Sequence, residues 1–146
     1  MVCEKIEDCS QNFNDAGTSL VDKKGGDSKY VLRNNSRSNY EVIDFENCVY
    51  KNRQNDTKCD FGIKTKNTIY YVELKGCKVS KGIKQLLKTI VETKACFPEH
   101  HKKARLVVSR FPRPDLVKKT KDYKDLVRQI GLQDIVITQK VHTDII

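Results

Sequence analysis

The stretch at residues 58–75 constrains the fold most, because two apolar, strand-like runs meet there at a polar turn and each run carries an acid. Asp60 lies in the first run, and Glu73 and Lys75 end the second. Side chains two residues apart in a strand point to the same face, so Glu73 and Lys75 project together. If the runs pair as a hairpin, Asp60 can lie opposite them. Two carboxylates and an ammonium group in one patch are unfavourable unless a cation and a substrate use them.

The hydrophobic pattern predicts several strands first and then alternating helices and strands. Before residue 77 the apolar runs are short and strand-like, and afterwards apolar residues recur three and four positions apart in two longer segments. An antiparallel meander followed by β-α-β crossovers gives an α/β fold with a central mixed sheet flanked by helices. We predict strands at residues 30–32, 40–50, 58–63, 69–76, 105–109 and 135–138, with a bend in the second strand near Asn47. We predict one helix at residues 80–96, capped by Ser80, and another at residues 115–130, ended by Gly131.

The length and the charge of the chain limit its organisation and its partners. A chain of 146 residues suits one domain. Residues 1–28, rich in Asp, Asn, Ser and Gly, are interpreted as a weakly ordered N-terminal segment, and residues 29–146 as a single α/β domain. The net charge of +9 favours a polyanionic partner, with nucleic acid ahead of an anionic membrane. A charge excess that only improves solubility is the alternative.

The hydropathy pattern and the cysteines together suggest a reducing compartment. No apolar run approaches membrane-spanning length, and residues 1–5 lack the apolar core of a signal peptide, so we expect a cytoplasmic protein without a membrane partner. The sequence has neither a Cys-x-x-Cys motif nor a zinc-like spacing with histidine. Most cysteines are therefore predicted to be small buried apolar residues, while Cys3 and Cys9 are left without a role. The six are Cys3, Cys9, Cys48, Cys59, Cys77 and Cys96.

The acids of the hairpin suit a hard divalent cation. Mg²⁺, for which Mn²⁺ can substitute, prefers one or two carboxylates together with water and phosphate oxygens. Asp60 and Glu73 can supply the carboxylates, and the main-chain carbonyl of Leu74 can supply another oxygen. Lys75 can position or deprotonate an attacking water, or stabilise the charge that develops on phosphorus. This set of residues suits hydrolysis of a phosphodiester bond.

The same residues resemble the motif of a known superfamily. Asp60 is followed after twelve residues by Glu-Leu-Lys at 73–75, and then by a helix with Gln85. This pattern resembles the PD-(D/E)XK nuclease superfamily of restriction endonucleases and junction resolvases, including its small bacterial members. The resemblance covers residues 30–138 and implies a restriction endonuclease-like fold. It also implies a Mg²⁺-dependent nuclease, an endonuclease rather than an exonuclease, in which both acids bind metal and the lysine assists catalysis.

The motif departs from the family pattern at two points. Cys59 stands where a proline often precedes the aspartate, at a position that mainly shapes the backbone. The acid that the family often draws from a first helix has no clear counterpart, and Asp44 or Glu46 can take its place if the sheet brings either close. Both of these acids also fit a structural or solvated role. Gln85 is an accessory candidate that either orients a phosphate or water or serves a polar helix face.

Lysines on the predicted helix after the hairpin form a basic ridge beside the acids. They recur three and four residues apart, opposite the apolar stripe, which suits contacts with the phosphates of a nucleic acid, DNA in the first place. The next helix has a similar character. The nucleic-acid-binding candidates are Lys78, Lys81, Lys84 and Lys88, and the second group is Lys118, Lys119, Lys121 and Lys124.

Other interpretations of these residues remain open. The acids and Lys75 also fit the solvated face of an ordinary hairpin. The fold can instead support a nucleic-acid-binding module with little or no catalysis, or a basic surface that meets an acidic protein. The chain has no room for a separate target-recognition domain, so we expect a homodimer if both strands of a duplex are cut.

Overall fold

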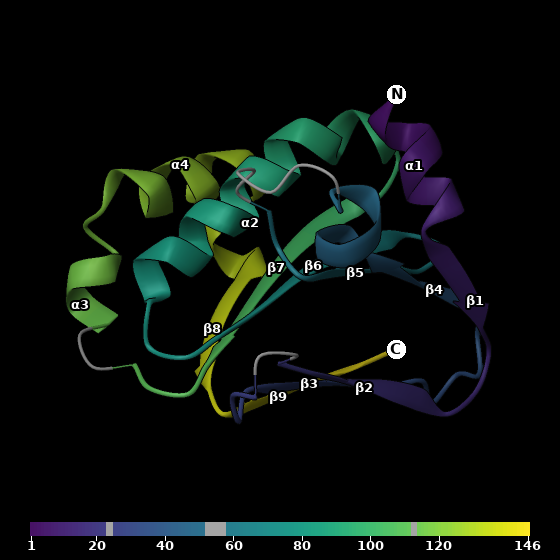
Figure 1. Ribbon diagram of the computed structural model, residues 1–146, viewed down its shortest axis with the longest axis horizontal. Coiled ribbons are helices and arrows are strands. Elements are labelled where there is room, and N and C mark those ends of the chain that lie inside the picture. Colours follow the sequence, from purple (N-terminus) through teal and green to yellow (C-terminus); the bar gives the residue numbers. More distant parts are fainter. Residues whose placement is uncertain (23–24, 52–57, 112–113) are drawn as a thin grey trace.

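The computed structural model describes residues 1–22, 25–51, 58–111 and 114–146, which form three layers (Figure 1). One layer contains the helices α2 (Val79–Thr93) and α4 (Lys121–Ile130). The middle layer is a six-stranded sheet whose strands are, in spatial order, β1 (Ser10–Phe13), β4 (Tyr40–Asp44), β5 (Phe61–Lys64), β6 (Thr68–Lys75), β7 (His101–Val108) and β8 (Ile135–Gln139). The third layer is a smaller sheet of β2 (Gly17–Val21), β3 (Lys29–Arg33) and β9 (Val141–Ile145).

The strand directions agree with the predicted class. Strands β1, β4, β5 and β6 are antiparallel neighbours, whereas β6, β7 and β8 run parallel. Parallel neighbours need crossover connections, which α2 supplies between β6 and β7, and α3 (Pro114–Val117) with α4 between β7 and β8. In the small sheet, β3 is antiparallel to β2 and parallel to β9. The prediction of an α/β fold with a mixed sheet and flanking helices is confirmed.

Strand β6 lies at the centre of the core because both of its faces are covered. Ile69 and Tyr71 pack with the helices, and Tyr70 and Val72 pack with the small sheet. A strand buried on both faces needs a nearly continuous apolar run, which explains why the sequence of β6 is so apolar. Glu73 is the exception in this run, and it is fully buried.

The long strand predicted up to Tyr50 ends early, and a single turn of π-helix follows it. This turn, η1 (Phe45–Val49), begins where the Asp44 side chain accepts the Asn47 N–H at 2.9 Å. The N–H groups of its first two residues donate to the Asp60 carbonyl at 3.2 and 3.3 Å. The backbone is therefore used for capping and for contact with Asp60, so it cannot continue the sheet ladder.

The N-terminal segment differs from the weakly ordered segment predicted for residues 1–28. Its described part forms α1 (Val2–Asp8), β1 and β2. Strand β1 pairs with β4 and strand β2 pairs with β3. The local sequence lacks strong periodicity, so these elements depend on partners that lie elsewhere in the chain.

Two local predictions for the helices also need correction, and one strand near the C-terminus was missed. Helix α2 begins at Val79 without a side-chain cap from Ser80. The single helix predicted at 115–130 is divided into α3 and α4, because Thr120 accepts the Tyr123 N–H at 3.3 Å and starts a new helix. Strand β9, which includes His142, was not predicted at all. In the described part of the chain, no helix is both long and apolar enough to cross a membrane.

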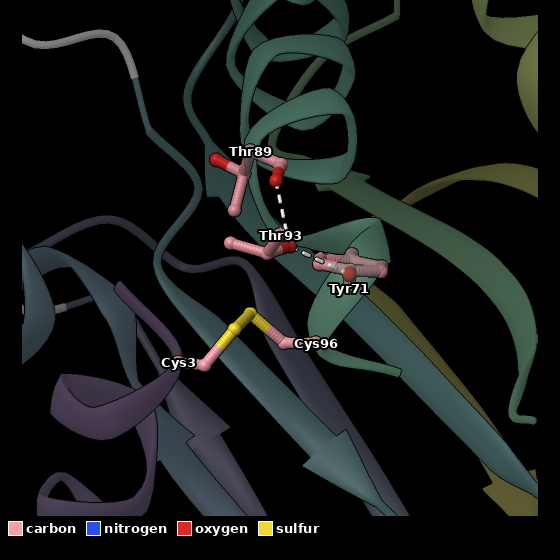
Figure 2. Close-up of a disulfide and its surroundings, with 5 residues drawn as sticks. All are labelled: Cys3, Tyr71, Thr89, Thr93 and Cys96. Carbon is pink, nitrogen blue, oxygen red and sulfur yellow. Dashed lines mark hydrogen bonds between the residues drawn. A yellow bond between two sulfur atoms is a disulfide. The ribbon is translucent and has the colours of Figure 1, made fainter. Parts of the chain in front are cut away.

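The cysteine prediction is wrong for most positions. Cys3 is bonded to Cys96, and Cys9 is bonded to Cys48. The first disulfide joins α1 to η2 (Lys94–Cys96), the short turn after α2 (Figure 2). Only Cys59 is the buried free thiol expected, whereas Cys77 is exposed. The bonded residues lie 93 and 39 positions apart, and single cysteines at such separations give no pairing signal in the sequence.

Candidate functional site

The candidate site lies where β5 and β6 separate. Their antiparallel ladder ends at the pair Phe61 and Val72. Beyond this pair, the Leu74 N–H donates to Oδ2 of Asp60 at 2.9 Å, so a side chain replaces the missing backbone partner. The N–H and C=O of one strand residue point to the same side, so the Leu74 carbonyl also faces Asp60. Asp60 and the end of β6 are thereby joined.

Glu73 is a buried acid with few polar contacts. It is on the helix-facing side of β6, and its exposed fraction is 0%. Its Oε2 is 3.2 Å from Nζ of Lys75, and neither carboxylate oxygen has a hydrogen bond of good geometry among the residues described. Burial, followed by the negative charge of Asp60, raises the pKa of Glu73 well above its usual value, although Lys75 opposes this shift.

Glu46 is the third acid of the site, and η1 carries it. Burial raises the pKa of Asp60 to about 7, and hydrogen bonding with the Glu46 carboxyl adds to the shift. The Leu74 N–H and Lys75 favour the ionised form of Asp60 but do not outweigh these effects. Asp60 therefore keeps its proton to a higher pH than an exposed aspartate does.

A cleft of about 390 Å³ opens over these groups. One wall comes from the end of β2 and the residue after it, and another comes from η1. Glu73 is not part of the lining but is paired with Lys75, whose side chain is 17% exposed. The lining residues are Val21, Asp22, Glu46, Asn47, Asp60, Phe61, Leu74, Lys75 and Gly76.

The two predicted accessory residues do not line the cleft. Asp44 caps η1 through Asn47, so its carboxylate serves the turn rather than the site. Gln85 donates from Nε2 to the Lys58 carbonyl at 3.1 Å. Its role toward a phosphate or water stays a prediction, but the structure shows that it holds the backbone just before Asp60.

The predicted basic ridge is on the surface. All four candidate lysines are exposed, on α2 and at the residue before it. The lysines of the second group, on α4 and in the turn before it, are exposed as well. Their contact with nucleic acid stays a prediction.

The donor atoms fit a hard divalent cation in part. Within the described ranges, no three His, Cys, Asp or Glu side chains form a group that could hold a metal ion. Mg²⁺ does not need such a group, because it often binds through one or two carboxylates and keeps several waters. Asp60, Glu73 and the Leu74 carbonyl are oxygen donors of that kind. The buried Glu73 oxygens, which lack hydrogen bonds within the described structure, are the feature that a cation would satisfy.

Sequence reasoning missed Glu46 as the preferred third acid and missed Asp22 altogether. The side chains of residues 40–46 alternate between two faces as in a strand. This pattern gave no reason to place Glu46 closer to Asp60 than Asp44. No family model matches the chain, and no curated protein or solved structure matches it. The function must therefore be inferred from the site.

Proposed function

We propose that the protein is a divalent-cation-dependent nuclease of the PD-(D/E)XK superfamily with a restriction endonuclease-like fold. It hydrolyses phosphodiester bonds as an endonuclease, and the proposed substrate is DNA. The observation that supports this most is the contact of the Leu74 N–H with Asp60 at 2.9 Å, together with the Lys75–Glu73 ion pair at 3.2 Å. These contacts connect Asp60 and Lys75, which line the cleft, with the buried Glu73 behind Lys75.

The residues of the site have separate tasks in this proposal. Asp60, Glu73 and the Leu74 carbonyl hold the cation, Mg²⁺ or Mn²⁺, and Glu46 supports Asp60. A bound cation would supply Lewis-acid stabilisation of the charge that develops on the phosphate. The partly exposed Lys75 ammonium extends from buried Glu73 to the cleft, where it can donate to a phosphate oxygen or orient the attacking water.

Cleavage assays with a matched lysine control test the proposal. Purified protein is incubated with plasmid, single-stranded and branched DNA in Mg²⁺ or Mn²⁺. We expect cleavage by the wild type and a loss of at least about 100-fold in rate for Lys75→Ala, because Lys75 stabilises the transition state. Lys66→Ala, in the exposed turn at the opposite end of β6, should cut at the wild-type rate. The proposal fails if the wild type cuts none of these substrates or if both variants cut equally well.

A nucleic-acid-binding module without catalysis is the second candidate. The raised pKa values of Asp60 and Glu73 favour protonated acids over carboxylates that are ready to bind a metal ion. The exposed lysines of α2 would still contact phosphates. This candidate predicts DNA binding that weakens with salt and is unchanged by Mg²⁺ or by Lys75→Ala. Competition by heparin but not by DNA would instead favour an acidic protein partner.

Assembly and compartment also belong to the proposal. A homodimer would let an endonuclease of this size cut both strands of a duplex. The two disulfides favour an oxidising environment, because disulfides are rare in the reducing cytosol. This differs from the cytoplasmic location expected from hydropathy and cysteine spacing.

A further inference from the structure

The η1 turn is a short element on which the cleft depends. It contributes Glu46 and Asn47 to the lining, and its first N–H groups contact the Asp60 carbonyl. A π-helical turn is rare and has little stability of its own. It is held by the core packing of Phe45 and Val49, and its start is fixed further by the Asp44 cap, the Asp60 carbonyl and a disulfide.

The Cys9–Cys48 disulfide connects this turn to the end of α1. Cys48 belongs to η1, only two residues after Glu46, and Cys9 follows α1 directly. The Cys9 carbonyl also accepts the Asp44 N–H at 3.3 Å, so the covalent bond reinforces the start of the turn. Both cysteines are partly exposed, which leaves the bond open to a reductant.

We propose that the Cys9–Cys48 disulfide is a redox-sensitive clamp on the carboxylate cleft, the cleft that Glu46 and Asp60 line. The intact disulfide holds η1 in the position where Glu46 meets Asp60. When the disulfide is reduced, the turn is released and the affinity of the cleft for a divalent cation falls. The cation-binding part of this inference rests on the proposed function. The reductant is a dithiol. Its first thiolate attacks one sulfur of the disulfide, which forms a mixed disulfide and releases one cysteine thiolate. Its second thiolate then attacks the mixed disulfide, which releases the other cysteine and leaves the reductant as an intramolecular disulfide. Two electrons and two protons pass to Cys9 and Cys48.

The second disulfide provides a matched control. Cys3–Cys96 also anchors α1, but its other end is in η2, beside Thr93 and Tyr71 (Figure 2). Neither Cys3 nor Cys96 lines the carboxylate cleft. We expect loss of this bond to remove a cross-link of the N-terminal segment without releasing η1.

Mn²⁺ binding and amide hydrogen exchange test the clamp. Titration calorimetry with MnCl₂ compares the oxidised full chain, Cys9→Ser/Cys48→Ser and Cys3→Ser/Cys96→Ser, at a temperature at which all three are folded by circular dichroism. We expect at least a tenfold loss of Mn²⁺ affinity and faster exchange at the Glu46 and Asn47 amides for Cys9→Ser/Cys48→Ser only. Wild type reduced with dithiothreitol should behave like this variant and should recover after reoxidation.

The outcomes separate the clamp from the proposed function. Equal effects of the two double variants, or unchanged Mn²⁺ affinity and exchange in Cys9→Ser/Cys48→Ser, overturn the clamp. If oxidised wild type binds no Mn²⁺, the metal-dependent function fails and the cation-binding part of the clamp fails with it. In that case, the rate of hydrogen exchange at the Glu46 and Asn47 amides is the measurement that shows whether the disulfide holds the turn. If Mn²⁺ binds but Lys75→Ala cuts DNA like wild type, the catalytic role fails while the clamp can still hold.

Discussion

Asp60 is the residue through which the parts of the site are connected. Its carboxylate accepts a hydrogen bond from β6, its carbonyl accepts two from η1, and its pKa is raised to about 7. Protons and a cation compete for such a carboxylate, so cation affinity should increase as the pH rises through 7. Burial is thus acceptable at this position because the acid is partly neutral when no cation is bound.

The raised pKa of Asp60 predicts how stability depends on pH. The folded state holds a proton that the unfolded chain releases near pH 4, so the stabilising contribution is complete below pH 4 and is lost as the pH rises to about 7. Asp60→Asn keeps an acceptor for the Leu74 N–H without the charge. We expect the variant to be more stable than wild type by roughly 2–4 kcal/mol at pH 8, with a much smaller difference at pH 4.

Urea unfolding at both pH values measures this difference. Asp8→Asn, a change on the exposed surface of α1, serves as the control and should leave the pH profile of wild type unchanged. A gain of equal size at pH 4 and pH 8 would show that the pKa of Asp60 is not the cause.

At the scale of elements, α2 positions the site through the segment before β5. Thr89 accepts the Cys59 N–H at 2.8 Å and donates to the Gln85 carbonyl at 2.8 Å. Gln85 holds the Lys58 carbonyl, so two side chains of one helix fix the two residues before Asp60. Thr93 repeats the arrangement one turn later, where it donates to the Thr89 carbonyl and meets the Tyr71 hydroxyl (Figure 2).

Replacing the Thr89 hydroxyl should destabilise this connection. Thr89→Val keeps the shape of the side chain but leaves the buried Cys59 N–H without its acceptor. We expect a loss of about 1–3 kcal/mol in the free energy of unfolding, measured by urea denaturation. Thr89→Ser keeps the hydroxyl and should lose clearly less. Equal losses in the two variants would indicate that the methyl group matters more than the hydrogen bond.

The sequence predicted the regular elements of this region and missed the irregular one. Residues 69–75 and 80–93 carry strong strand and helix periodicities, so β6 and α2 were recognised. The sequence predicted a bend near Asn47 but not the η1 turn itself, because a capping side chain, a distant carbonyl and a disulfide help to determine that turn. The preferred third acid was missed for the same reason.

At the scale of the whole molecule, a polar network joins the small sheet to the main sheet. Arg105 of β7 donates to Oδ2 of Asp144 in β9 at 2.8 Å, and the Tyr30 hydroxyl of β3 donates to the same atom at 2.8 Å. The Arg105 guanidinium also lies over the Tyr70 ring, 5.5 Å from its centroid. Although burial opposes it, hydrogen bonds from His142 and Arg105 hold the pKa of Asp144 well below its usual range.

Loss of one partner of this network should destabilise the attachment of the small sheet. Asp144→Ala leaves the nearly buried Arg105 uncompensated, for which we expect a cost of about 3–5 kcal/mol in thermal or urea unfolding. The double change Arg105→Met/Asp144→Leu removes both charges and should recover much of this loss. A double variant as unstable as Asp144→Ala would contradict the role of the buried charge.

The sequence by itself determined the properties that depend on neighbouring residues. Strand and helix periods identified the α/β class, and the spacing of Glu73 and Lys75 placed them on one face of β6. Only the tertiary structure decided which distant segments meet: β3 with β9, Cys9 with Cys48, and Glu46 with Asp60. Each of these pairs depends on chain closure over many residues, which leaves no periodic mark in the sequence. The completed carboxylate cleft is therefore a property of the fold.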